Sequence, residues 1–167
     1  CKNKIYYFFH SIIYEKKYKF FLMKDSVSKM KIPQQIEHYK ILKFLGSGSY
    51  SVVHLALDTR TNTEYAVKIV PTSSFIKKSV LEHFEMETRV LHQMRHPNII
   101  HFVDILRDDF NIYVVIELCP NGDLYNYIIS QKFLSEQEAK YLFKQFLFGL
   151  NYIHSIGAMH RDLKPEN

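Results

Sequence analysis

His160-Arg161-Asp162-Leu163-Lys164-Pro165-Glu166-Asn167 decides how the rest of this chain is interpreted. The segment places a carboxylate (Asp162), a cation (Lys164) and a side-chain amide (Asn167) within six residues. Phosphoryl transfer needs these residue types, because a carboxylate orients the attacking hydroxyl while a cation and metal ligands stabilise the transferred phosphate. The alternative is a solvated, charged turn after a helix. The motifs upstream of this segment decide between the two interpretations.

Two glycines lie in a predicted turn between two predicted strands, Tyr39–Leu45 and Val52–Leu57. The turn reads Gly46-Ser47-Gly48-Ser49-Tyr50-Ser51, and glycines in such a position let backbone amides approach an anion closely. An ordinary hairpin turn is the alternative. A strand rather than a helix follows, and no Gly-x-x-x-x-Gly-Lys sequence occurs, so neither a dinucleotide-binding fold nor a P-loop is indicated.

A lysine interrupts the third predicted strand, Tyr65–Val70. By strand alternation Lys68 shares a face with Ala66, so it is either an edge residue with a buried stem or a buried cation that needs a partner. The helix predicted over Val80–Met94 offers Glu87 on the same stripe as its apolar residues. A Lys68–Glu87 ion pair would allow both charges to be buried and would hold the lysine for an anionic ligand.

The remaining pattern predicts one more hairpin and then two helices. Pro97 ends the first helix, and Phe102–Leu106 and Ile112–Glu117 are apolar runs on either side of a polar turn. Leu118–Gly122 is the expected boundary between a β-rich part and a helical part. Asp123 is the expected cap of a short helix that follows this boundary.

The last predicted helix begins at a capping box formed by Ser135 and Glu138 and extends to about His154. Gly157 is the residue expected to terminate it. Its apolar stripe consists of Ala139, Leu142, Phe143, Phe146, Leu150 and Ile153. We therefore expect an α+β fold, in which five antiparallel strands and one helix precede a helical part.

These motifs, in this order, resemble the signature set of the eukaryotic protein kinase family. The chain has Gly-x-Gly with Val53 after it, Ala66-Val67-Lys68 on the third strand, a glutamate on the next helix, and His-Arg-Asp-x-x-x-x-Asn at residues 160–167. Lys164 is typical of the serine/threonine type. The hinge sequence Asn-Gly-Asp-Leu makes the chain most similar to the calcium/calmodulin-dependent kinase group.

The resemblance covers residues 39–167 and implies a domain organisation. A five-stranded β lobe with one helix spans residues 39–117, a hinge spans 118–122, and the start of a helical lobe spans 123–167. An extension, residues 1–38, precedes them. No Asp-Phe-Gly follows Asn167, so we expect a truncated catalytic domain with little activity of its own.

The resemblance also implies transfer of the ATP γ-phosphate to Ser/Thr hydroxyls of protein substrates, with ATP and Mg²⁺ as cofactors. Asp162 would be the catalytic base, assisted by Lys164; Asn167 would bind magnesium, and Glu87 would hold Lys68 against the α- and β-phosphates. ATP would contact Leu45, Gly46, Ser47, Gly48, Ser49, Tyr50, Ser51, Val52, Val53, Ala66, Lys68 and the backbone of Glu117 and Cys119. Ile116 would be the gatekeeper beside the adenine.

Two acids, Asp123 and Glu166, stand where relatives bind basic residues upstream of the phosphorylated residue, so the resemblance implies substrates that contain Arg or Lys. Solvent exposure or helix capping is the alternative role for these acids. Ser51 stands where the family has a third glycine. Two other functions remain open: a non-catalytic module that binds nucleotide or another kinase, and a small-molecule phosphotransferase.

The net charge of +5 comes mainly from residues 1–22, where five lysines face one glutamate. The rest of the chain is close to neutral, so we expect neither nucleic-acid nor membrane binding. Two cysteines, Cys1 and Cys119, are too few for a disulfide framework or a zinc site, which favours a reducing, cytoplasmic location.

The first 22 residues consist mostly of Lys, Asn, Ile, Tyr and Phe, whose codons can be built from A and T alone. We interpret them as translated AT-rich DNA that is not native to the protein, with the natural start at Met23 or Met30. A targeting segment is the alternative, although the apolar run Ile5–Tyr14 is too short to span a bilayer and no small-residue cleavage site follows it.

Overall fold

The computed structural model describes residues 30–48, 51–75, 81–82, 84, 88, 91–160 and 163–165. These residues belong to two compact units. The β-rich unit contains the described residues between 30 and 93 and those from 101 to 118, and the helical unit contains residues 94–100 and the described residues from 119 to 165. Residues 1–22 and six predicted site residues lie outside the described part of the chain: Ser49, Tyr50, Glu87, Asp162, Glu166 and Asn167.

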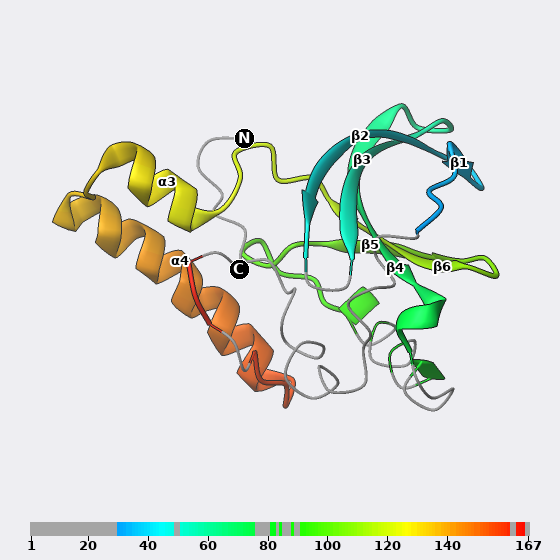
Figure 1. Cartoon of the computed structure of the whole chain (residues 1–167). Helices are drawn as coiled ribbons and strands as arrows, with labels where there is room; N and C mark the ends of the chain where they lie inside the picture. Colours follow the sequence, from blue (N-terminus) through cyan, green and yellow to red (C-terminus); the bar gives the residue numbers. More distant parts are fainter. Residues whose placement is uncertain are drawn as a thin grey trace. The chain divides into compact units, whose positions relative to one another are not determined.

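A single antiparallel sheet forms the β-rich unit (Figure 1). Its strands are β1 (Gln35–Ile36), β2 (Tyr39–Ser47), β3 (Val52–Asp58), β4 (Thr63–Pro71), β5 (Phe102–Arg107) and β6 (Asn111–Glu117). They lie in the order β1-β2-β3-β4-β6-β5, so strands that follow one another in the chain are paired except β4 and β5, since β4 pairs with β6. The expected succession of hairpins is thus confirmed.

The expectation of five strands was one too few. The sixth, β1, contains only two residues and pairs with β2 through a tight turn in which Glu37 has a φ of 48°. A strand this short has no alternation that a sequence pattern could show. The end of β2 also differs, because Gly46 and Ser47, predicted to lie in the turn, pair with Val53 and Val52 of β3.

The two faces of the sheet have different roles. One face covers the core of the unit, which consists of Tyr39, Val52, Ala56, Val67, Ile69, Leu106, Tyr113 and Val115. Because side chains alternate along a strand, Val53, Ala66 and Lys68 lie on the opposite face. We refer to this opposite face as the site face, since it carries the predicted ligand-binding side chains of β3 and β4.

A buried hydrogen-bond network holds the β5–β6 hairpin. The Tyr113 hydroxyl donates to Asp108 Oδ2 at 2.6 Å, and Asp108 Oδ1 accepts from the backbone amides of Phe110 and Asn111. The Asn111 side chain donates to the Tyr113 hydroxyl and to the carbonyl of Lys31. The network therefore joins the segment before β1 to the hairpin at the other edge of the sheet.

A short 3₁₀ helix, η4 (Thr72–Ser74), follows β4. The described residues of the helix predicted over Val80–Met94 are helical up to His92; they are Leu81, Glu82, Phe84, Thr88, Leu91 and His92. Phe84 and Thr88 are buried as predicted, and the Thr88 hydroxyl donates to the Phe84 carbonyl one turn earlier. Met94 is buried but not helical, so this helix ends two residues earlier than predicted.

Two helices, α3 (Leu124–Gln131) and α4 (Glu136–Ser155), lie side by side in the helical unit (Figure 1). Ser135 caps α4 by accepting a hydrogen bond from the Glu138 amide, as predicted. The return bond of the predicted capping box is not seen, and Glu138 Oε1 accepts from the Tyr127 hydroxyl of α3. That bond links the two helices.

The C-terminal end of α4 follows from Gly157, which has a φ of 75°. Its amide donates to the His154 carbonyl and the Ala158 amide donates to the Ile153 carbonyl, the bond pattern of a Schellman motif. Leu142, Gly149 and Ile153 are the buried residues of α4, whereas Phe143, predicted to belong to its apolar stripe, is 58% exposed. No helix in the described residues is long and apolar enough to cross a membrane.

Residues 94–100 pack on α4. The Arg95 amide donates to the Tyr152 hydroxyl, the His96 ring stacks on the Tyr152 ring at 5.1 Å, and the Asn98 side chain donates to Gln145 Oε1. The carbonyl of Asn98 lies so close to Gly149 that a Cβ there would be 3.1 Å from the oxygen. A side chain at this place in the helix would require the Asn98 backbone to move away by a few tenths of an ångström.

Candidate functional site

The strand pairing gathers the predicted site residues of the β-rich unit into two neighbouring rows. Gly46, Val53 and Lys68 are paired across β2, β3 and β4, and Ala66 is paired with Ile116 across β4 and β6. Paired residues lie on the same face with their Cβ atoms about 5 Å apart. The site face thus combines small and branched apolar side chains with one lysine.

The two rows differ in how far their side chains are buried, and the difference suits a ligand that has a flat apolar part next to a charged part. Ala66 and Ile116 are 7% and 8% exposed, whereas Val53 and Lys68 are half-buried. Leu45, which precedes the glycines on β2, is 42% exposed. Lys68 is a cation within the apolar stretch Tyr65–Val70 of β4, so an anionic group could approach it while a ring packs on Val53 and Ala66.

The turn between β2 and β3 is closed by a backbone hydrogen bond from the Gly48 amide to the Ser51 carbonyl at 2.9 Å. Ser51 is only 2% exposed, so its side chain belongs to the protein interior. Ser47 is exposed and lies at the strand end. Ser49 and Tyr50, the tip of the turn, lie outside the described residues.

The Val52 side chain is better explained by packing than by ligand binding. Val52 is 9% exposed and belongs to the core on the face opposite Val53. The prediction included it because it lies within a continuous motif, whereas alternation divides the side chains of such a motif between the two faces. Its neighbour on the same face, His54, contacts the Phe44 ring edge-on at 5.6 Å, and burial lowers the His54 pKa below its ordinary value.

The end of β6 is held by both the backbone and the side chain of Glu117. The Glu117 amide donates to the His101 carbonyl at 2.9 Å, and Glu117 Oε2 accepts from the His101 amide at 3.2 Å. No sequence pattern singles out His101, because the contact joins residues 16 positions apart. The Glu117 side chain was likewise not predicted to have a role.

The helical unit begins with a turn that ends in Gly122. The Gly122 amide donates to the Cys119 carbonyl at 3.3 Å, and Gly122 has a φ of 73°, which favours glycine. Cys119 is half-buried. Asp123 then caps α3, since its two carboxylate oxygens accept from the amide and the side chain of Asn126.

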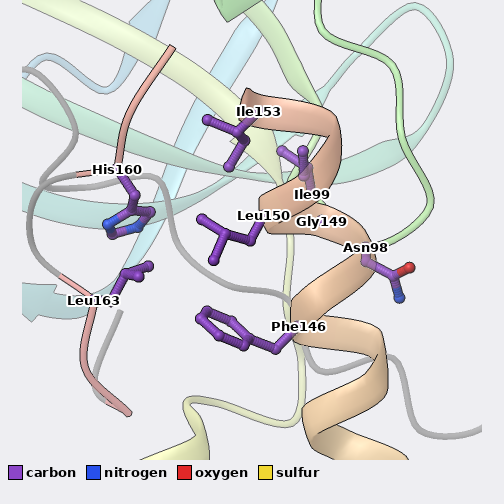
Figure 2. A pocket seen from close by; sticks show the side chains of 8 residues that line it. All are labelled: Asn98, Ile99, Phe146, Gly149, Leu150, Ile153, His160 and Leu163. Atoms are coloured by element: carbon purple, nitrogen blue, oxygen red, sulfur yellow. The ribbon is translucent and has the colours of Figure 1, made fainter. Parts of the chain in front are cut away.

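The segment that carries the proposed catalytic residues rests on α4. His160 is 3% exposed, and Figure 2 shows its ring and the Leu163 side chain facing Leu150 and Phe146 of α4. These side chains line a small apolar pocket together with Asn98, Ile99, Gly149 and Ile153. Arg161 and Asp162 lie outside the described residues, but His160 and Leu163 on either side of them are in contact with this pocket.

The chemical inventory of the described residues is therefore an apolar strip with a lysine in one unit and a carboxylate-capped helix in the other. Lys164 is exposed. Within the described ranges no group of three or more His, Cys, Asp or Glu side chains could hold a metal ion, and the predicted magnesium ligand, Asn167, falls outside them.

Comparison with known proteins identifies the class. The sequence model of the protein kinase domain matches residues 39–167. Serine/threonine-protein kinase cds1 of Schizosaccharomyces pombe is 34% identical over 148 residues, which are 86% of this chain and 32% of that protein. CBL-interacting serine/threonine-protein kinase 8 of Arabidopsis thaliana is 33% identical over 136 residues, 81% of this chain and 31% of that protein.

A third relative, SNF1-related protein kinase catalytic subunit alpha KIN12 of Arabidopsis thaliana, is 36% identical over 137 residues, 82% of this chain and 28% of that protein. The chain spans about a third of the length of these relatives. The α+β architecture and the family match agree, and the chain belongs to the protein kinase domain family, among its serine/threonine members. The similarity to the calcium/calmodulin-dependent group is consistent with these relatives.

Proposed function

We propose that the protein transfers the γ-phosphate of ATP to serine or threonine hydroxyls of protein substrates. The observation that carries the proposal is the site face of the sheet, where Ala66 and Ile116 lie in the row next to Val53 and Lys68. An apolar surface beside a cation fits a purine that carries phosphates. Members of the family act in this way, so the geometry and the family support the same function.

The residues of the β-rich unit would bind and orient ATP. Leu45, Val53 and Ala66 would pack on the adenine, and backbone amides around Gly46 and Gly48 would approach the phosphates. Lys68 would neutralise the α- and β-phosphates, with Glu87 as its proposed ion-pair partner. A cation held on a strand would fix the position of the phosphates before transfer, which is where most of the catalytic effect of such sites comes from.

The residues around His160 would act on the attacking hydroxyl. Asp162 would orient the hydroxyl and accept its proton, and Lys164 would stabilise the charge that develops on the transferred group. The contacts of His160 and Leu163 with α4 support this role, since they would hold the backbone on both sides of Asp162. Asn167 would hold Mg²⁺, which neutralises phosphate charge when bound.

Asp123 and Glu166 would select substrates with basic residues upstream of the phosphorylated residue. Asp123 lies at the start of α3, and the Tyr125 amide donates to the Pro165 carbonyl, so the segment before Glu166 is tied to this helix end. Capping uses one lone pair of each Asp123 oxygen and leaves carboxylate capacity for an arginine. A cytoplasmic location goes with this proposal, because ATP and a reduced Cys119 thiol are expected there.

The test is phosphorylation of a basic serine peptide by the full-length protein with MgATP. We expect Asp162→Asn to lower kcat by about 10²- to 10⁴-fold, because the general base is removed. Lys68→Met should lower kcat/KM for ATP, and Lys40→Met, at an exposed position on β2, serves as the control. Full activity in Asp162→Asn would contradict the proposal. MgATP binding without any transfer by the wild-type protein would favour the non-catalytic nucleotide-binding module instead.

A further inference from the structure

Glu117 and His101 form an unusual pair at the end of the β5–β6 ladder. In a regular hydrogen-bonded antiparallel pair the two residues exchange two bonds between backbone amides and carbonyls. Here the Glu117 amide donates to the His101 carbonyl, but the His101 amide donates to the Glu117 carboxylate, 3.2 Å away. The Glu117 carboxylate thus accepts the hydrogen bond that the Glu117 backbone carbonyl would accept in a regular pair.

The ladder needs additional support at this point. Phe102 is paired with Ile116, and β5 has a register shift between Phe102 and Asp104, one pair further along the ladder from Glu117 and His101. A register shift leaves part of a ladder unpaired and bends the strand. A hydrogen bond to an ionised carboxylate is stronger than a neutral one, so it can hold the strand end where the regular pattern is interrupted.

Glu117, whose position this hydrogen bond fixes, is also the residue whose backbone is proposed to recognise adenine. Glu117 is the last residue of β6, it follows Ile116 on the site face, and its backbone is proposed to bond the adenine edge. A misplacement of about 1 Å at a residue that positions a substrate can cost about 10²-fold in rate. The orientation of the Glu117 backbone therefore matters more than that of an ordinary strand end.

We infer that the Glu117 side chain is a positioning residue for ATP: by accepting from the His101 amide, its carboxylate fixes the backbone at the end of β6 in the geometry that binds the adenine edge. The inference rests on the proposed kinase function and adds a role for a side chain to which the family resemblance assigns only backbone contacts. It concerns the described β-rich unit alone, because Glu117 and His101 both belong to it.

The experiment compares Glu117→Ala and Glu117→Gln in the full-length protein, with KM for ATP, KM for peptide and kcat measured separately. Glu117→Ala should raise KM for ATP about tenfold, as expected for loss of one hydrogen bond to a charged group, while kcat and the peptide KM change less than about twofold. Glu117→Gln should restore most of the ATP affinity, because its amide oxygen can still accept from the His101 amide. If the Glu117 side chain only stabilised the fold, Glu117→Ala would instead lower kcat in proportion to the fraction of protein that is folded.

Hydrogen exchange of the His101 amide provides a readout that does not depend on activity. Exchange should become faster in Glu117→Ala and remain slow in Glu117→Gln. Glu64→Ala, which removes an exposed carboxylate from β4, is the matched control and should change neither exchange nor KM.

Three results would overturn the inference: unchanged exchange in Glu117→Ala, faster exchange with an unchanged KM for ATP, or equal KM values for the Ala and Gln variants. If the wild-type protein transfers no phosphate, the proposed function fails, and the equilibrium Kd for MgATP replaces KM in the same comparison. A wild-type protein that binds no nucleotide would overturn both.

Discussion

The backbone amide of Tyr125 donates a 3.0 Å hydrogen bond to the carbonyl of Pro165, which ties the first turn of α3 to the segment that follows His160. Asp123 caps the same helix with both of its carboxylate oxygens. The capping role and the proposed substrate role of Asp123 use the same group, so they have to be separated by a substitution that keeps the cap and removes the charge.

Asp123→Asn makes that separation, because asparagine caps helices about as well as aspartate. We expect a small change in melting temperature, because the Asn126 amide keeps its acceptor and only the bond from the exposed Asn126 side chain is lost. We expect a KM about tenfold higher for a peptide with an upstream arginine, as for loss of one charge-assisted contact. The KM of a matched peptide with glutamine in place of that arginine should not change. Glu136→Gln, which neutralises an 83% exposed side chain at the start of α4, is the control. Equal use of both peptides by the wild-type protein would show that the basic preference is wrong.

Gly149 is predicted to favour the close contact between α4 and residues 94–100. Alanine normally stabilises a helix by about 1 kcal/mol relative to glycine, but a Cβ here would lie 3.1 Å from the Asn98 carbonyl oxygen. We expect Gly149→Ala to show little or none of that gain, and Gly149→Val to lower the free energy of unfolding by about 1–3 kcal/mol. Urea denaturation measures both variants. A clear gain in stability for Gly149→Ala would mean that residues 94–100 can move away without cost.

Much of this architecture could be predicted because it is encoded locally. Alternation assigned Ala66 and Lys68 to one face, and the side chains of Asp123 and Ser135 indicated two helix starts. These signals depend on residues a few positions apart, where strand geometry and capping chemistry leave few choices.

The features that the sequence did not predict depend on distant contacts. The Glu138 carboxylate bonds Tyr127 rather than completing its capping box, and the Arg95 amide bonds the Tyr152 hydroxyl 57 residues away. Both hydrogen bonds depend on how separate segments pack against each other, and a local sequence pattern contains no information about that packing. Among the predicted site residues, Val52 is the one whose side chain the core buries, because the motif is continuous whereas alternation divides its side chains between two faces.

The Tyr113 hydroxyl is predicted to stabilise the β-rich unit. Tyr113→Phe removes the donor to Asp108 and the acceptor for the Asn111 side chain, which is 2% exposed, and leaves buried polar groups without these partners. The expected loss in the free energy of unfolding is about 1–3 kcal/mol, measured by urea denaturation. Tyr141→Phe, at a position that is 52% exposed on α4, should cost less than about 0.5 kcal/mol. Equal effects of the two substitutions would mean that the network contributes nothing to stability.

The Asp58 carboxylate is predicted to make stability depend on pH in the acid range. Hydrogen bonds from the Arg60 side chain, at 3.1 Å and 3.3 Å, lower the pKa of Asp58 from 3.8 to about 2. The folded state therefore favours the ionised form, so this contribution is fully present above about pH 4 and is lost as the pH falls from 4 to 2. His38 Nε2, 3.7 Å from Asp58 Oδ2, acts in the same direction when it is protonated.

Arg60→Gln should raise the Asp58 pKa towards its ordinary value and lower stability at neutral pH. Because folded and unfolded states then bind protons alike, the free energy of unfolding should fall less steeply between pH 4 and pH 2 than in the wild-type protein. Urea denaturation at closely spaced pH values measures the slope, and NMR titration of the Asp58 carboxyl measures the pKa. Lys43→Gln removes the same unit of charge from an exposed position on β2 and should keep the wild-type slope. Identical slopes for Arg60→Gln and the wild-type protein would show that Asp58 titrates normally in the folded state and that the Arg60 contact does not contribute to acid stability.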